Sequence, residues 1–193
     1  MIDFIQSKIK NSIELKTKLL NDSTVLKQVE GLVNDIITCY KNGGKVLWCG
    51  NGGSAADAQH LAAELSGRFY YDRPPLFSEA LHVNTSYTTA VANDYGYELI
   101  YSRLIKAMGK KGDVLIGLST SGNSANVINA LEEANKMGMI TSSFTGETGG
   151  KMKDLSKYLI NIPSTDTPRI QECHMLLGHT ICELVELKLF PKN

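Results

Sequence analysis

Residues 45–64 of this chain read KVLWCGNGGSAADAQHLAAE, and this stretch decides the fold. The apolar run 45–49 predicts a buried strand, and the alanine-rich segment after Ser54 predicts a helix. The glycine turn between them lets backbone N–H groups approach a ligand closely, because glycine accepts positive φ angles. A strand, a glycine turn and a helix in this order can bind an anion or a sugar at the helix N-terminus. Such turns also occur in α/β proteins that bind nothing there, so this motif alone leaves both interpretations open.

A second copy of the unit follows at residues 112–125, which read GDVLIGLSTSGNSA. Its turn carries the hydroxyls of Ser119, Thr120, Ser121 and Ser124, whose donors suit a phosphate held without a basic side chain. One of these residues is expected to cap the helix that begins near Ser124. Because four hydroxyls exceed what a cap needs, the second turn predicts a phosphate site.

Length and composition predict a single domain over residues 1–193, with a helical hairpin at 1–42 and an α/β core at 43–193. The 20 Lys and Arg residues balance the 20 Asp and Glu residues, and no long basic run occurs. Nucleic acid and anionic membrane surfaces are therefore not expected partners. The N-terminus has no signal-peptide pattern, and no transmembrane span is visible. The cysteines lack C-x-x-C spacing and are expected to be reduced core residues of a cytoplasmic protein; they are Cys39, Cys49, Cys173 and Cys182.

Apolar runs separated by helical patterns predict a parallel sheet of about five strands with helices on both faces. The remaining strands are expected at 78–84, in the apolar run that opens the second unit, at 140–145 and at 158–162. The helices are expected at 2–20, 23–40, 98–108, 126–137 and 169–190, with a shorter one that begins at 88 and is interrupted at 93–96. Both glycine turns would then lie at the carboxyl ends of strands, where ligands of such sheets bind.

Three segments allow two interpretations each. The mildly apolar N-terminal helices could pack on the core or, as we favour, on another subunit. The loop 67–75, rich in aromatic and arginine side chains, could border a site or an interface, or could be a solvated surface loop. Asn93 and Asp94 could face a ligand or cap the following helix.

Four polar side chains on two predicted helices are candidates for chemistry. His60 and Glu64 are four residues apart and so point the same way. Gln171 and His179 are eight apart, about 80° around their helix, and share one half of it. Each has a structural alternative: a histidine in a helix is more often structural than catalytic, His60 could bond to a neighbouring subunit, and Glu64 could be an exposed charge.

Four separated motifs occur in one order: GNGGSAADAQH at 50–60, AND at 92–94, STSGNS at 119–124 and RIQECH at 169–174. Together they resemble the phosphoheptose isomerase family of the sugar isomerase (SIS) superfamily, over about residues 2–190. The resemblance implies a three-layer αβα sandwich with a flavodoxin-like five-stranded parallel sheet. It also implies aldose-ketose isomerisation of D-sedoheptulose 7-phosphate to D-glycero-D-manno-heptose 7-phosphate, a precursor of heptose for lipopolysaccharide, capsule or another surface glycan. Members of this family are typically cytoplasmic homotetramers with sites between subunits.

The same resemblance implies roles for individual residues. Glu64 and His179 would move protons, and zinc would be bound by His60, Glu64, Gln171 and His179. The residues expected to contact substrate are Asn51, Gly52, Gly53, Glu64, Asn93, Asp94, Ser119, Thr120, Ser121, Ser124 and Gln171. These roles conflict at Glu64, because a carboxylate bound to zinc is a poorer base.

The residue types suit this chemistry, since interconverting a ketose and an aldose requires proton transfer at carbon and between two oxygens. The chain also resembles a non-catalytic SIS protein of the replication-initiator-associating type, which binds a protein partner. Such relatives can keep the glycine turns and the tetramer without the proton-transfer pair, so the presence of Glu64 and His179 favours an enzyme. An isomerase or sensor of another sugar phosphate is the third possibility.

Overall fold

Five parallel strands form the centre of the computed structural model, which describes residues 1–192. Across the sheet they are β2 (Ser78–Ala80), β1 (Val46–Gly50), β3 (Val114–Ser119), β4 (Ile140–Thr145) and β5 (Tyr158–Asn161). Every neighbouring pair is parallel. The order 2-1-3-4-5 is that of flavodoxin-like sheets, so the expected fold class is confirmed.

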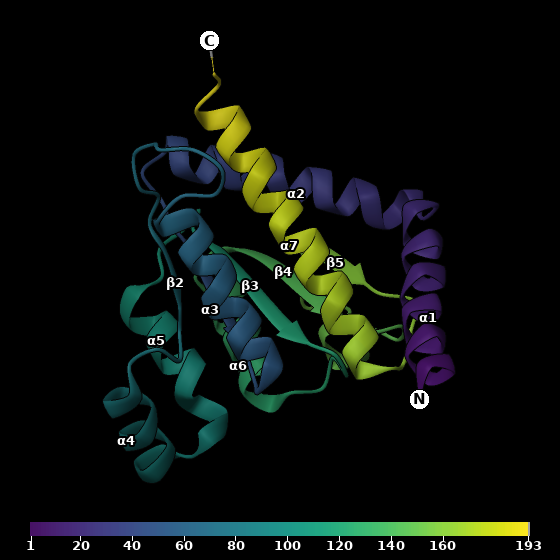
Figure 1. Ribbon diagram of the computed structural model, residues 1–193. Coiled ribbons are helices and arrows are strands. Elements are labelled where there is room, and N and C mark those ends of the chain that lie inside the picture. The colour runs from purple at the N-terminus through teal and green to yellow at the C-terminus, as the bar shows by residue number, and fades with distance from the viewer. Residues whose placement is uncertain (193) are drawn as a thin grey trace.

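Helices cover both faces of this sheet, as Figure 1 shows. One face carries α2 (Ser23–Lys41), α3 (Gly53–Ser66) and α7 (Thr167–Leu189), and the other carries α5 (Ile100–Met108) and α6 (Ala125–Lys136). The helix α4 (Thr85–Tyr95) projects from the body, at the lower left of Figure 1, and a 3-10 turn at Tyr97–Leu99 joins it to α5. A second 3-10 turn covers Gly150–Met152.

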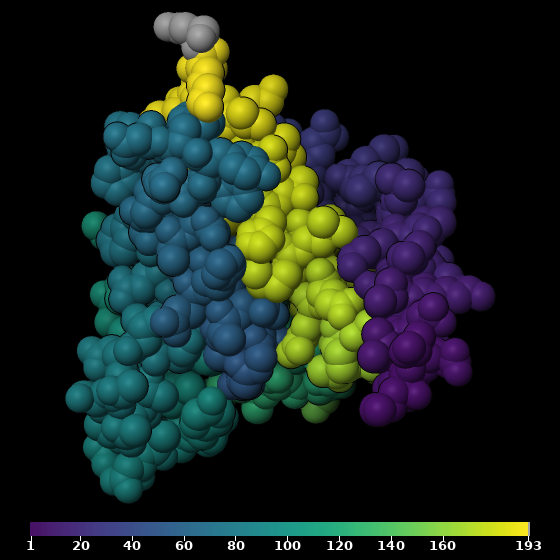
Figure 2. All heavy atoms as spheres, in the orientation of Figure 1, coloured from purple at the N-terminus to yellow at the C-terminus, as the bar shows by residue number. Residues whose placement is uncertain are grey.

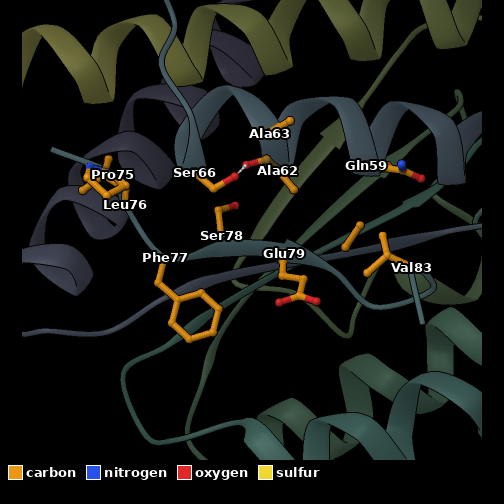
Figure 3. A pocket seen from close by; sticks show the side chains of 11 residues that line it. Gln59, Ala62, Ala63, Ser66, Pro75, Leu76, Phe77, Ser78, Glu79 and Val83 are labelled. Atoms are coloured by element: carbon orange, nitrogen blue, oxygen red, sulfur yellow. Dashed lines mark hydrogen bonds between the residues drawn. The ribbon is translucent and has the colours of Figure 1, made fainter. Parts of the chain in front are cut away.

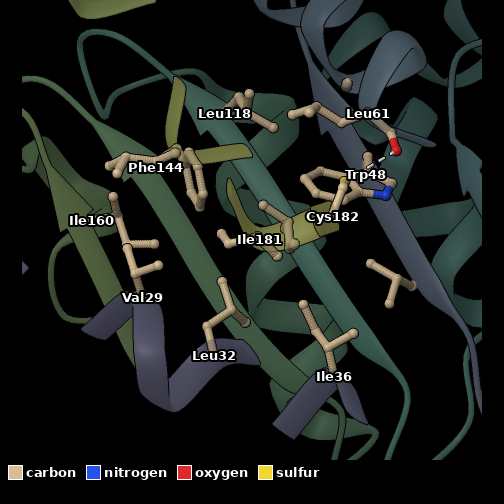
Figure 4. Close-up of a cluster of buried hydrophobic side chains, with 14 of the residues drawn as sticks. Val29, Leu32, Ile36, Trp48, Leu61, Leu118, Phe144, Ile160, Ile181 and Cys182 are labelled. Atoms are coloured by element: carbon tan, nitrogen blue, oxygen red, sulfur yellow. Dashed lines mark hydrogen bonds between the residues drawn. The ribbon is translucent and has the colours of Figure 1, made fainter. Parts of the chain in front are cut away.

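The strands are buried on both faces, which explains why they appear in the sequence as continuous apolar runs. In β1, Val46 and Trp48 point to the cluster under α2, α3 and α7, whereas Leu47 and Cys49 point to the cluster under α5 and α6. Figure 4 shows the first cluster, where side chains from α2 and α7 meet Trp48 over the sheet. Burying each such large side chain contributes about 1.5 to 3 kcal/mol.

Two expected boundaries are wrong. The strand expected at 78–84 ends at Ala80, because the Asn84 side chain accepts the Tyr87 N–H at 3.0 Å and starts α4 there. The helix expected to break at 93–96 continues through Asn93 and Asp94. It ends only at Gly96, whose φ of 101° no other residue type adopts easily.

The two predicted N-terminal helices both form, α1 spanning Ile2–Leu20. In Figure 1, α1 turns steeply away from α2. It packs along the first half of α7, where the Ser12 hydroxyl donates to Glu172 at 2.8 Å and Arg169 donates to the Lys8 carbonyl at 3.0 Å. The outer face of α1 is left exposed.

All four cysteines are buried with free thiols, as expected for core residues. Within residues 1–192, no helix is long and apolar enough to cross a membrane.

One buried histidine ties α7 to the sheet. The Nε2 atom of His174 lies 3.1 Å from the Thr145 carbonyl, and the ring packs edge-on against Phe144. Burial lowers the pKa of His174 from 6.5 to about 4, against the opposing effect of the Thr145 hydrogen bond. The folded chain therefore holds this imidazole neutral.

This buried imidazole predicts an acid-sensitive fold. Below about pH 6.5 the unfolded chain binds a proton at His174 that the folded chain takes up only near pH 4. The free energy of unfolding should therefore fall by about 2 to 3 kcal/mol between about pH 7.5 and about pH 4.5 because of this residue. Urea unfolding at both pH values, for the native chain and for His174→Gln, measures the contribution. The same pH dependence in both proteins would contradict it.

Candidate functional site

The two glycine-containing turns lie next to each other at the carboxyl edge of the sheet. The strands that lead into them, β1 and β3, are neighbours, and Gly50 pairs in register with Leu118. The strand order reverses between these two strands, which is where ligands of flavodoxin-like sheets bind. The structure therefore brings the two predicted ligand-binding turns together.

A reciprocal pair of side-chain amides joins the two turns. Asn51 donates to Asn126 at 2.9 Å, and Asn126 donates back to Asn51 at 2.8 Å. The Tyr97 hydroxyl donates to the same Asn51 oxygen at 3.0 Å. The Asn51 side chain, expected to contact substrate, thus binds the start of α6. Our sequence reasoning missed Asn126 and Tyr97; the available signal was a polar residue at 126 where the first copy of the unit has Ala56.

Three of the four predicted hydroxyls converge in the second turn. The Ser119 oxygen lies 2.9 Å from that of Ser124 and 3.4 Å from that of Ser121. Gly122 has a φ of 66° and packs so tightly against Gly149 that a side chain there would collide with the Gly149 backbone. The turn is therefore a preformed group of hydroxyls, with Thr120 lying within it.

The candidate catalytic side chains meet between α3 and α7, which lie side by side in Figure 2. The His60 Nε2 atom lies 3.0 Å from the His179 Nε2 atom and 3.1 Å from a Glu64 carboxylate oxygen. Gly178 permits this approach, because a Cβ at 178 would collide with Leu61 of α3. The predicted meeting of a carboxylate and an imidazole from different helices thus occurs within one chain.

A cavity of about 540 Å³ beside this cluster is lined by both His179 and Gln171. Gln171 also touches the first turn, since a Cβ at Gly53 would lie 2.6 Å from its side-chain nitrogen. Asp57 lines the same cavity, and one of its carboxylate oxygens is buried without a hydrogen-bond partner among the described residues. Burial raises the pKa of Asp57, and the nearby His60 acts in the opposite direction.

Asp57 is a residue that our sequence reasoning missed. It precedes His60 by three residues and Glu64 by seven, so all three lie along one side of α3. This spacing was visible in the sequence and could have identified it.

The donor atoms of His60, Glu64 and His179 all lie within 4.8 Å of one another. A tetrahedral zinc ion with bonds of about 2.0 to 2.1 Å places its ligand atoms about 3.3 Å apart. The two contacts of 3.0 and 3.1 Å are close to that spacing, and imidazole and carboxylate are ordinary zinc ligands. These three residues therefore fit a divalent metal such as zinc. The expected fourth ligand, Gln171, stays a prediction.

Asn93 and Asp94 lie apart from this group. Both are exposed on α4, where the Asn93 amide donates to Asp94 at 2.9 Å, and Figure 1 places α4 away from α7. Their contact with substrate stays a prediction, and within one chain they do not join the histidine cluster.

A larger cavity, about 590 Å³, lies between α3 and the segment 75–83 and is drawn in Figure 3. Its lining includes one carboxylate, Glu79, and neither histidine nor cysteine. His179, Gln171 and Asp57 line the cavity beside α7 instead.

Comparison with known proteins gives consistent matches. Residues 11–146 match the model of the SIS domain family. A phosphoheptose isomerase of Aneurinibacillus thermoaerophilus is 52% identical over 190 residues, 98% of this chain and 96% of the relative. One from Clostridium acetobutylicum is 49% identical over 193 residues, 100% of this chain and 98% of the relative.

Solved structures of phosphoheptose isomerases superpose closely on this chain. A phosphoheptose isomerase of Neisseria gonorrhoeae superposes with a TM-score of 0.88 at 40% identity. One from Francisella tularensis superposes with a TM-score of 0.90 at 34% identity. Each comparison covers 95% of this chain and 97% of the other.

The amide pair between the turns predicts a measurable coupling. Asn126→Ala should lower the free energy of unfolding by about 1 to 3 kcal/mol, because it leaves the Asn51 amide without its partner. In a double-mutant cycle with Asn51→Ala, the two substitutions should couple by about 0.5 to 3 kcal/mol. Urea unfolding measures each variant, with Asn34→Ala, at an exposed position of α2, as the control. Strictly additive effects would contradict the coupling.

Proposed function

The chain belongs to the phosphoheptose isomerase family of SIS domain proteins, and we propose that it interconverts D-sedoheptulose 7-phosphate and D-glycero-D-manno-heptose 7-phosphate. The observation that carries this proposal is the contact of His60 with both Glu64 and His179. It unites an acidic and an imidazole side chain between α3, which begins at the first turn, and α7, whose Gln171 contacts that turn. The product would supply heptose for a surface glycan.

The hydroxyls of Ser119, Ser121 and Ser124 are proposed to hold the phosphate, with help from the backbone N–H groups at the start of α6. The phosphate takes no part in the reaction. Its binding energy orients the sugar chain, so that the carbonyl end lies beside the side chains of α3 and α7. Such orientation supplies a large share of the rate enhancement in reactions of this kind.

Glu64 is proposed to remove the proton from the carbon next to the carbonyl and to return it to the neighbouring carbon. His179 would move protons between the two oxygens of the resulting enediolate. Gln171, which lies against Gly53 and lines the same cavity, is proposed to donate a hydrogen bond to substrate. In these roles the group would supply both a base and an acid, as aldose-ketose isomerisation requires.

We further propose that His60, Glu64 and His179, with the Gln171 oxygen, hold a zinc ion. When bound, zinc would polarise the substrate carbonyl and stabilise negative charge on oxygen. A carboxylate that ligates a metal is a weaker base, so Glu64 can remove a proton only when it is not fully committed to the ion.

A homotetramer in the cytoplasm is proposed as the working state. Support comes from α1, whose outer stripe of Ile2, Ile5, Ile9 and Ile13 is 56 to 71% exposed. An apolar stripe of this kind favours contact with another chain. Sites between subunits would also allow Asn93 and Asp94 of one chain to reach the cluster of a neighbour.

The first experiment tests the isomerase activity directly. Purified protein incubated with sedoheptulose 7-phosphate should form an aldose, detected by chromatography. Glu64→Gln should abolish turnover but leave the fold and the binding of the sugar phosphate intact, because the amide keeps the shape and loses the base. Glu132→Gln, an exposed position on α6, is the control. An inactive native chain would favour the partner-binding alternative, and full activity in Glu64→Gln would remove that residue from the mechanism.

The proposed zinc site leads to a separate prediction. Protein purified without chelator should contain about one zinc per chain, because four ligands of this type bind the ion tightly. His60→Asn should reduce the zinc content several-fold, whereas His82→Asn, a histidine outside the cluster, should not. Elemental analysis by mass spectrometry measures both, and zinc well below one equivalent in the native protein would argue against a resident metal.

A further inference from the structure

A buried ion pair lies at the far end of the contact between α3 and α7. The Arg73 Nε atom donates to a Glu186 carboxylate oxygen at 3.0 Å, and each side chain is only 1% exposed. Buried ion pairs contribute little net stability, because desolvating both charges costs about as much as their attraction returns. Both side chains of the pair also make further hydrogen bonds, which connect other parts of the chain.

The Arg73 guanidinium binds the end of α3. It donates to the Glu64 carbonyl at 2.8 Å, to the Leu65 carbonyl at 2.7 Å and to the Gly67 carbonyl at 3.2 Å. The last carbonyls of a helix have no partner within the helix, and here one side chain satisfies several of them. One of these carbonyls belongs to Glu64, whose carboxylate contacts His60, so Arg73 fixes the backbone that carries the proposed base.

The Glu186 carboxylate binds the loop that follows α3. It accepts the Phe69 N–H at 2.9 Å and the Tyr70 N–H at 2.8 Å. Burial alone would raise the pKa of Glu186, but these N–H groups and the Arg73 guanidinium together lower it, so the carboxylate is charged at neutral pH.

This loop reaches the catalytic imidazole through an aromatic ring. The Phe69 ring centre lies 5.8 Å from that of His179. Glu186 follows His179 by seven residues, two turns along the same side of α7. One carboxylate thus anchors the loop to α7 and holds Phe69 against His179.

We propose that Arg73 and Glu186 are positioning residues for the isomerisation, which set the separation of Glu64 and His179 by clamping the end of α3 and the Phe69 loop onto α7. This role rests on the proposed function. It also gives the loop 67–75, for which the sequence left two interpretations, a place at the border of the site. Both side chains are only 1% exposed and neither lines the cavity beside α7, so both act through Glu64 and His179.

The test uses Arg73→Lys and Glu186→Gln. Lysine keeps the charge but cannot donate to the carboxylate and to several carbonyls at once. In both variants kcat should fall at least tenfold. The KM for sedoheptulose 7-phosphate should stay within twofold, because the proposed phosphate site at Ser119, Ser121 and Ser124 lies on a different element. The matched control is Asp113→Asn, which breaks the buried Lys45–Asp113 pair at the amino ends of β1 and β3. The kcat of Asp113→Asn should stay within twofold of the native value, even if its free energy of unfolding falls by as much as that of Arg73→Lys or Glu186→Gln.

Variants that unfold at the same urea concentration as the control but keep full kcat would overturn the positioning role. An equal loss of kcat in Asp113→Asn would also overturn it, because general destabilisation would then explain the effect. If Arg73→Lys and Glu186→Gln do not fold, Phe69→Leu decides: a fall in kcat at unchanged KM supports the role, and full kcat overturns it. A native chain without isomerase activity overturns the proposed function and this role together, whereas active variants overturn the role alone.

Discussion

The contact between the Asn51 and Asn126 amides is the interaction on which the arrangement of the site depends. The two residues are 75 positions apart in the chain, and each satisfies a donor and an acceptor of the other. Neither loop can shift without leaving a largely buried amide unpaired, which costs more than the bond itself contributes. From this contact the first turn continues to Gly53, where Gln171 brings in α7. These contacts therefore fix the positions of the second turn, the first turn and α7 relative to one another.

The position of α3 is determined at both ends and in the middle. At its start it follows the turn that carries Asn51, along its length Leu61 packs into the space left by Gly178, and at its end Arg73 binds its last carbonyls. Each of these contacts is made to a different element of the chain. A helix held in this way keeps His60 and Glu64 at a defined distance from His179, and the proposed proton transfer requires such a fixed geometry.

Much of the fold could be predicted from local pattern. The apolar runs before the two glycine turns, the helical spacing of residues 2–40 and the apolar run at 140–145 correspond to β1, β3, α1, α2 and β4 as the structure has them. The errors fall at β2 and α4, where a side-chain cap from Asn84 and a single glycine at 96 decide the boundaries. Among site residues, the helical spacing of His60 with Glu64 was informative, whereas Asp57, Asn126 and Tyr97 escaped notice. Arg73 was noted only as part of the loop 67–75, for which the sequence left two interpretations. Asn126, Tyr97 and Arg73 owe their importance to partners far away in the sequence, whereas the helical spacing of Asp57 with His60 was visible locally.

The sequence by itself determined which side chains share a face of a helix and which turns follow a buried strand, because helix and strand geometry set these relations within a few residues. The order of the strands brought the two turns together, and the packing of α7 on α3 brought His179 to His60. Only the tertiary structure decided these contacts. They arise between elements separated by about a hundred residues, where spacing along the chain carries no information about distance in space.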